Sequence, residues 1–146
     1  PAALARYERG LARYPQHLQL IHDYPRTLLL ERRHADVVRY VEPVLLTRPA
    51  DPVLHQLAAE AQAALGNAMQ SHRHQGEYYA ALGDSAGAIE QFELALRAVG
   101  RGGDTRDLLV IETRLKALRA EQHPAGEGQA PVGRDLHLGR PFSPLS

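Results

Sequence analysis

The stretches EAQAALGN, residues 60–67, and EYYAALGD, residues 77–84, nearly copy each other and decide the fold. Working outward, Pro15 and Pro49 stand 34 positions apart, and Gly66 and Gly83 stand 17 apart, which is half that spacing. A period of this length is typical of helical hairpins that stack and bury their apolar faces against one another. The repeat therefore predicts an all-α array of antiparallel helices.

Helix-breaking prolines and glycines divide the chain into segments of helix length. Ala, Leu, Arg, Glu and Gln are abundant and rank high in helix propensity. Ala88, Phe92 and Ala95 follow the spacing of one helical face. Pro43 should kink its helix, and Pro25 should kink or split another. We expect about seven helices, over residues 2–14, 17–31, 34–47, 52–65, 68–82, 85–99 and 105–121.

Capping residues mark several of these starts. Asp51 precedes a proline, as an N-cap followed by proline at the first helical position does. Asp104 can cap the last helix in the same way. Asn67 and Gln70 have the spacing of a capping box, although the usual first member is Ser or Thr. The spacing predicts reciprocal caps at that third start.

Composition separates one helical domain, residues 1–121, from a Pro/Gly-rich C-terminal tail, residues 122–146. The 146-residue chain has 17 basic and 17 acidic residues, which argues against a nucleic-acid partner. It has no cysteine and no apolar run of the roughly 18–20 residues that a membrane-spanning segment needs. The chain begins at Pro1, so we expect a piece of a longer protein. The tail could be held by a neighbour or lie across the domain's own surface, and PFSPLS, residues 141–146, could dock into another copy.

Catalytic and metal-binding patterns are missing from this sequence. It contains no H-E-x-x-H, no phosphate-binding G-x-x-x-x-G-K-[ST] and no G-x-S-x-G. His72 and His74 point away from each other on a helix, and His34 and His55 stand alone. We therefore predict no catalytic residue, no metal site and no cofactor in this chain.

The segment from His72 to Gly100 resembles the tetratricopeptide-repeat (TPR) consensus. Gly76 stands at the small residue that lets the first helix of a hairpin approach its neighbour, and Tyr79 stands at the aromatic position between helices. The segment departs from the consensus at its first aromatic, at the following Leu and at the terminal Pro. Helix 68–82 fits one hairpin as the second helix and the next as the first. We therefore expect a TPR-like α-solenoid with one irregular junction there.

This resemblance implies a partner-binding groove on the concave face, lined by the first helix of each hairpin. By position the lining residues are Gln19, His22, Arg26, Gln56, Glu60, Arg73 and Glu77. Family members that capture a terminal carboxylate use asparagines where this chain has Arg26, Glu60 and Glu77. We therefore expect a protein surface or an extended peptide segment as partner, rather than a C-terminal carboxylate.

A longer run, HQGEYYAALGDSAGAIEQFELALRAVGRGGDTRDLLVIETRLKALRAE, residues 74–121, resembles the C-terminal repeat domain of bacterial M48-family metalloproteases of the β-barrel assembly-enhancing type. The resemblance extends more generally over residues 1–121. It implies a periplasmic parent with a separate zinc-peptidase domain, and a role in outer-membrane β-barrel protein assembly and quality control. The barrel assembly machinery or its substrates would then be the partners. A stand-alone TPR adaptor with an unrelated protein partner, in the cytoplasm or the periplasm, is the alternative. An enzyme complete in this chain is a third hypothesis, which the missing motifs disfavour.

Overall fold

The computed structural model describes residues 2–100 and 103–123, and these fold into helices without a strand. The helices are α1 (Ala2–Arg13), α2 (Leu18–Leu30), α3 (His34–Leu45), α4 (Pro52–Ala64), α5 (Ala68–Ala81), α6 (Ser85–Val99) and α7 (Thr105–Gln122). The predicted all-α fold is confirmed, and each predicted helix is present with ends that differ by two residues or fewer. Pro25 lies inside a continuous α2, so the split that we allowed for does not occur.

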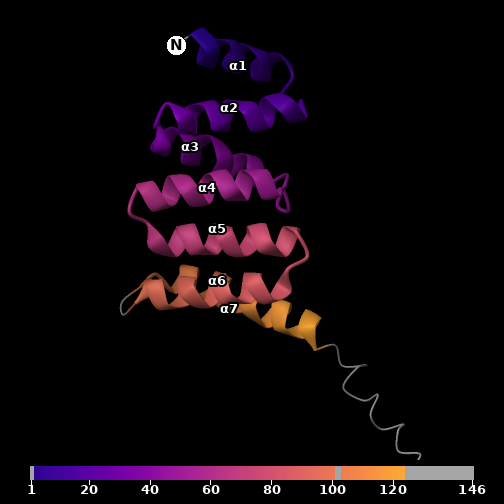
Figure 1. Ribbon diagram of the computed structural model, residues 1–146, viewed down its shortest axis with the longest axis vertical. Helices are drawn as coiled ribbons and strands as arrows, with labels where there is room; N and C mark the ends of the chain where they lie inside the picture. Colours follow the sequence, from indigo (N-terminus) through magenta and orange to yellow (C-terminus); the bar gives the residue numbers. More distant parts are fainter. Residues whose placement is uncertain (1, 101–102, 124–146) are drawn as a thin grey trace, which may run out of the picture.

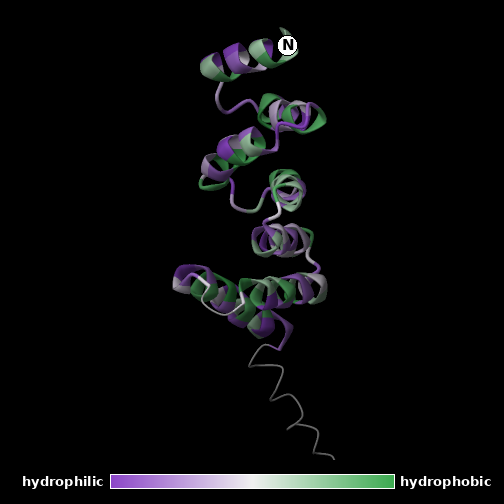
Figure 2. Cartoon of the chain, turned by 90° about the vertical axis from the view of Figure 1, so that its left-hand side faces the viewer, coloured by the Kyte–Doolittle hydropathy of each residue, from purple (hydrophilic) through white to green (hydrophobic). Residues whose placement is uncertain are grey.

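Consecutive helices run in opposite directions and follow one another along the long axis of the molecule (Figure 1). This packing is consistent with a solenoid-like arrangement. In Figure 2, α3 lies to one side of α2 and α4, whereas α4 and α5 follow one another in single file, as they also do in Figure 1. The single-file step falls at α5, the helix for which the sequence predicts two conflicting repeat registers.

Three turns between helices share one backbone conformation. Gly66 and Gly83 both have φ of 83°, in the left-handed region that glycine enters without steric cost. Arg32 occupies the same place in the turn between α2 and α3 with φ of 59°. Each turn is closed by a backbone N–H that donates to the carbonyl five residues earlier at 2.9 Å: Arg33 to Leu28, Asn67 to Gln62, and Asp84 to Tyr79. The same turn therefore forms between α2 and α3, although Arg32 replaces glycine there.

The predicted caps are confirmed at two helices and wrong at one. Asp51 accepts hydrogen bonds from the backbone N–H groups that follow it at the start of α4, and Asp104 accepts one at the start of α7. Asn67 makes no side-chain cap; its amide donates to Gln62 Oε1 at 2.7 Å instead. The side chain of Gln70 accepts from Arg73. The capping box fails because both amides find side-chain partners on neighbouring turns.

The apolar interior is divided into two clusters. The first lies among α1 to α4 and includes Ile21, Leu28 and Val41, and the second joins α6 to α7 around Phe92 and Ile111. Between them, the α4–α5 contact carries buried polar side chains as well as small ones. Burial of apolar surface therefore stabilises each half, while small buried side chains and hydrogen bonds together join the halves.

Gly76 sets the distance between α5 and α6. A Cβ atom at this position would lie 2.5 Å from Cε2 of Phe92, closer than van der Waals contact allows. Phe92 itself is fully buried. The sequence prediction of a close approach at this glycine is confirmed.

The described helices include none that is long and apolar enough to cross a membrane. The proposals for the tail concern residues that, from 124 onward, lie outside the described part of the chain.

Candidate protein-interaction surface

The loop between α3 and α4, residues 46–51, is the point where three cavities meet. Pro49 lines all three, which have volumes of about 590, 400 and 210 Å³. One opens toward α2, one toward α5 and α7, and one lies over α3, α4 and α5. Leu46, at the start of the loop, is 84% exposed. The loop therefore presents apolar side chains beside hollows that a partner could fill.

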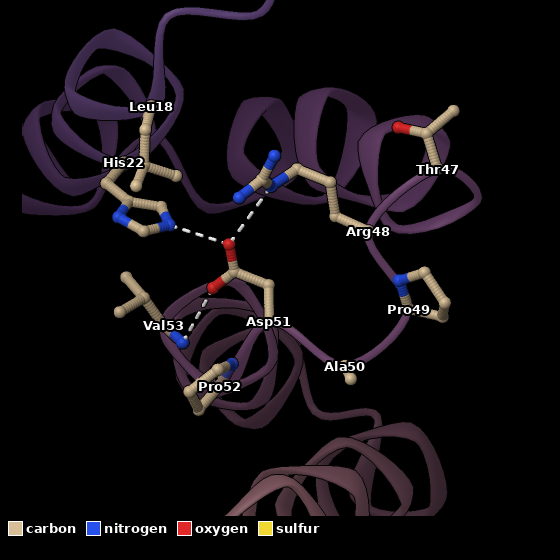
Figure 3. A pocket seen from close by; sticks show the side chains of 9 residues that line it. All are labelled: Leu18, His22, Thr47, Arg48, Pro49, Ala50, Asp51, Pro52 and Val53. Carbon is tan, nitrogen blue, oxygen red and sulfur yellow. Dashed lines mark hydrogen bonds and ion pairs between the residues drawn. The ribbon is translucent and has the colours of Figure 1, made fainter.

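The largest cavity is organised around Asp51 (Figure 3). Its Oδ2 atom accepts hydrogen bonds from His22 Nε2 at 2.7 Å and from Arg48 Nε at 3.3 Å, while Oδ1 accepts from the backbone N–H of Val53 at 3.0 Å. The lining is Leu18, His22, Thr47, Arg48, Pro49, Ala50, Asp51, Pro52 and Val53. Polar side chains such as His22 and Arg48 are interspersed with apolar ones such as Leu18 and Pro49 around this depression (Figure 3).

Burial and hydrogen bonding oppose each other at Asp51. Burial alone would raise the pKa of this carboxyl, but the hydrogen bonds from His22, the N–H of Leu54 and Arg48 hold its pKa below the usual value. The group is therefore a carboxylate at neutral pH, and it fixes α2 and the loop to the start of α4.

The second cavity lies beside an ion pair between α5 and α7. Arg114 donates to Glu77 through Nε at 2.8 Å and through Nη2 at 2.9 Å. This two-point geometry is the strong form of the guanidinium–carboxylate pair. Pro49, Ala50, Ala80 and Ala81 complete the lining. Glu77 and Arg114 therefore line this cavity with two opposite charges that neutralise each other.

The third cavity contains a chain of buried histidines. His55 Nε2 contacts the carbonyl of Pro49 at 2.8 Å, and His55 Nδ1 lies 3.0 Å from His74 Nδ1. His74 Nε2 lies 2.8 Å from Glu42 Oε2. The two rings are only 4% and 1% exposed. Three helices and the loop are thus joined by one line of hydrogen bonds.

The charges along this line are set by burial and by the neighbouring ring. The hydrogen bond from His74 holds the pKa of Glu42 below its usual value, against the opposing effect of burial. Burial lowers the pKa of His55, and the nearby His74 lowers it further. Glu42 is therefore a carboxylate and His55 a neutral ring at neutral pH.

The predicted groove residues are distributed over this surface and beyond it. His22 lines the first cavity, and Arg73 and Glu77 line the third together. The others are exposed: Gln19 and Arg26 on α2, and Gln56 and Glu60 on α4. The structure thus brings Arg73 and Glu77 together and places His22 on the far side of Pro49.

Sequence reasoning missed the residues that join these cavities. It treated His55 as isolated, and this is wrong, because His55 contacts His74 across 19 positions. It also left out Glu42 and Arg114. Their partners lie 32 and 37 positions away, and no local spacing signals such distances. Among the described residues, no group of three or more His, Asp or Glu side chains is arranged to hold a metal ion.

Comparisons with protein-family models, with curated proteins and with solved structures found no match. The structure defines the described part of the chain as an all-helical domain with hollows around the loop between α3 and α4.

Proposed function

We propose that this chain is a non-catalytic domain that binds a protein or an extended peptide segment across the loop 46–51. One observation carries the proposal, namely the meeting of three hollows at Pro49 beside the exposed Leu46. Exposed apolar side chains next to concave, partly polar surface are typical of protein interaction sites. Catalysis, where the parent protein performs any, is then assigned to another part of it.

The lining favours a polypeptide over a small apolar ligand. In the largest cavity Leu18, Pro52 and Val53 offer apolar contacts, while His22 and Arg48 present polar nitrogens. A peptide carries apolar side chains and backbone hydrogen-bonding groups in alternation, and so suits such a surface. The proposed binding residues are those of the loop and its hollows together with the predicted groove residues.

The parent that we propose is a periplasmic M48-type metalloprotease that takes part in outer-membrane β-barrel assembly and quality control. The support is the sequence resemblance of residues 74–121. The partner would then be the barrel assembly machinery or its substrates, and zinc would belong to the protease domain. The complete reading frame tests this. An upstream H-E-x-x-H and a signal peptide would support it, whereas their absence would favour the stand-alone adaptor.

Two matched leucines test the binding surface. Leu46 and Leu30 are exposed to nearly the same extent, 84% and 83%, but Leu46 follows the end of α3, whereas Leu30 ends α2, in front of the other end of α3. Leu46→Asp should weaken binding of purified barrel assembly complex, or of an unfolded barrel precursor, by about tenfold or more, the size of an interface anchor. Affinity is measured by biolayer interferometry on the full chain.

Leu30→Asp is the control and should leave the affinity unchanged. Equal weakening by both variants would indicate a general loss of the fold, which circular dichroism would report. Equal affinity of both variants and the unchanged chain would contradict the assignment of the surface to this loop.

A further inference from the structure

The buried chain of His55 and His74 makes three hydrogen bonds, but two neutral imidazole rings carry only two hydrogens on nitrogen. The Pro49 carbonyl can only accept, so His55 Nε2 donates to it. The contact between the two Nδ1 atoms needs one hydrogen, and the contact between His74 Nε2 and Glu42 Oε2 needs another. Three contacts require three hydrogens, and two neutral rings carry two.

The extra proton lies on the His74–Glu42 side of the chain, because His55 Nε2 already donates to the Pro49 carbonyl. The environments of the other two members make Glu42 a carboxylate and His55 a neutral ring. His74 then donates through both nitrogens, to Glu42 on one side and to His55 on the other. A neutral His74 would turn either a bare ring nitrogen toward a carboxylate oxygen at 2.8 Å or a bare Nδ1 toward the lone pair of His55.

The other histidine–carboxylate pair of the surface has no such requirement. His22 Nε2 contacts Asp51 Oδ2 at 2.7 Å, and its other nitrogen makes no hydrogen bond to the described part of the chain. One hydrogen on a neutral ring satisfies this pair. The need for an additional proton therefore arises from two rings in series between two acceptors, and not from a histidine beside a carboxylate.

The charged groups around the chain come from several elements. Glu42 on α3 favours a cation at His74, whereas Arg73 on α5, whose Nη2 atom lies 3.4 Å from His74 Nε2, opposes it. Glu77 on α5 faces the same cavity, and Arg114 on α7 neutralises it. The carboxylate is the nearer of the two groups at His74, so it decides the balance.

We propose that the His55–His74–Glu42 chain is a proton-binding site that links α3, α4 and α5 when it is occupied. Loss of the proton removes one of the three hydrogen bonds and leaves two lone pairs facing each other. The contact between α4 and α5, where the two apolar clusters meet, then loosens. The bottom of the third cavity is formed by the same side chains, so its shape depends on the proton.

The proposal predicts a maximum of stability near the pKa of free histidine, about 6.5. Above this pH the three groups carry no titrating proton in the unfolded chain, since both rings are neutral and the carboxyl is ionised. In the folded chain they carry one, so unfolding releases a proton. The unfolding equilibrium constant should then rise by up to about tenfold per pH unit. Below this pH the unfolded chain binds more protons than the folded chain, so acid also favours unfolding.

The substitution Glu42→Gln isolates the extra proton. The Gln amide supplies the hydrogen that neutral His74 lacks, so all three contacts persist without a third titrating proton. Urea unfolding of the full chain between pH 7 and 8.5 should show the rise for the unchanged protein and for Glu60→Gln, an exposed control on α4. Glu42→Gln should show no rise. An unchanged protein without the rise, or a Glu42→Gln variant that keeps it, would overturn the proposal.

A spectroscopic measurement keeps the test independent of the variant's folding. Nitrogen NMR of the unchanged chain with ¹⁵N-labelled histidine reports which ring nitrogens carry hydrogen. At pH 7.5 we expect hydrogen on both nitrogens of His74, and on Nε2 alone of His55. Two neutral rings at these positions would overturn the assignment.

Discussion

At the scale of single residues, Arg32 adopts the left-handed backbone conformation that glycine occupies in the two equivalent turns. A non-glycine side chain in the left-handed region costs roughly 1 kcal/mol. Arg32 adopts φ of 59° there because the turn is closed by the same backbone hydrogen bond as at Gly66 and Gly83. The contacts of the neighbouring helices impose the conformation on the residue.

Replacement of Arg32 by glycine should therefore stabilise the fold. We expect Arg32→Gly to raise the free energy of unfolding by up to about 1 kcal/mol, because it relieves the left-handed strain. Gly66→Ala is the reciprocal change and should lower it by a similar amount, since nothing lies within 4 Å of the added Cβ and only φ is at issue. Urea titrations measure both. A destabilising Arg32→Gly would contradict this explanation.

Asp51 combines a helix cap with two side-chain partners. Asp51→Ala should lower the free energy of unfolding by about 2 kcal/mol, at the upper end for caps, because His22 and Arg48 also lose their acceptor. Asp104→Ala is the control and should cost about 1 kcal/mol, since that side chain caps α7 alone. Thermal unfolding measured near neutral pH compares the two. Equal losses would indicate that the cap alone matters at Asp51.

The lowered pKa of Asp51 fixes the sign of its pH dependence. Its contribution is present above the unfolded value, about 3.9, and is lost as the pH falls through the lower folded value. Asp51→Asn keeps the capping oxygen and removes the charge. It should therefore unfold less steeply with acid than the unchanged chain. Urea midpoints between pH 5 and 2 provide the comparison.

At the scale of elements, α5 is the helix that determines how the rest of the stack continues. It packs on α4 and α6, reaches α3 through His74 and reaches α7 through Glu77. A repeat register assigned from sequence makes α5 either the second helix of one hairpin or the first helix of the next. The structure gives it contacts in both directions, because Gly76 admits Phe92 on one face while His74 points to the other helices.

Gly76→Ala tests the close approach of α5 and α6. The new Cβ would overlap the ring of Phe92, and overpacking of this kind costs about 1–3 kcal/mol. Gly10→Ala is the matched helical control: its Cβ would lie 3.0 Å from Cδ1 of Leu20, the movable end of a side chain. That variant should be neutral or stabilising by helix propensity.

A second variant separates overlap from other effects. Phe92→Leu removes the ring edge, so Gly76→Ala should cost less in its presence than in the unchanged chain. Free energies of unfolding for the four proteins give the coupling by a double-mutant cycle. Additive losses would mean that the ring is not the obstacle.

At the scale of the whole molecule, two apolar clusters joined by a partly polar contact predict two cooperative units. Leu28 belongs to the first cluster and Leu115 to the second. Leu115→Ala should lower hydrogen-exchange protection by about 2–5 kcal/mol in α6 and α7, with a smaller effect in α1 to α3. Leu28→Ala should show the opposite distribution. Hydrogen-exchange mass spectrometry resolves the helices, and equal losses throughout would indicate a single cooperative unit.

The candidate site was predictable only in part. Arg73 and Glu77 were predicted to line the groove from one helix, by their positions in the repeat, and they share a cavity. Pro49 was recognised as a repeat marker, but its place at the meeting point of three hollows depends on how α2, α4 and α5 surround it. Such an arrangement has no local pattern in the sequence.

The sequence by itself predicted the helices of the described residues to within two positions at each end, and the resemblance to the TPR consensus indicated the close contact at Gly76. The helices depend on groups within a few positions of one another, namely caps, helix-breaking residues and apolar spacing. The tertiary structure alone decided that His55 meets His74, that His74 meets Glu42, and that Arg114 meets Glu77. The reason is that these contacts depend on the relative placement of whole helices, which no local spacing in the sequence specifies.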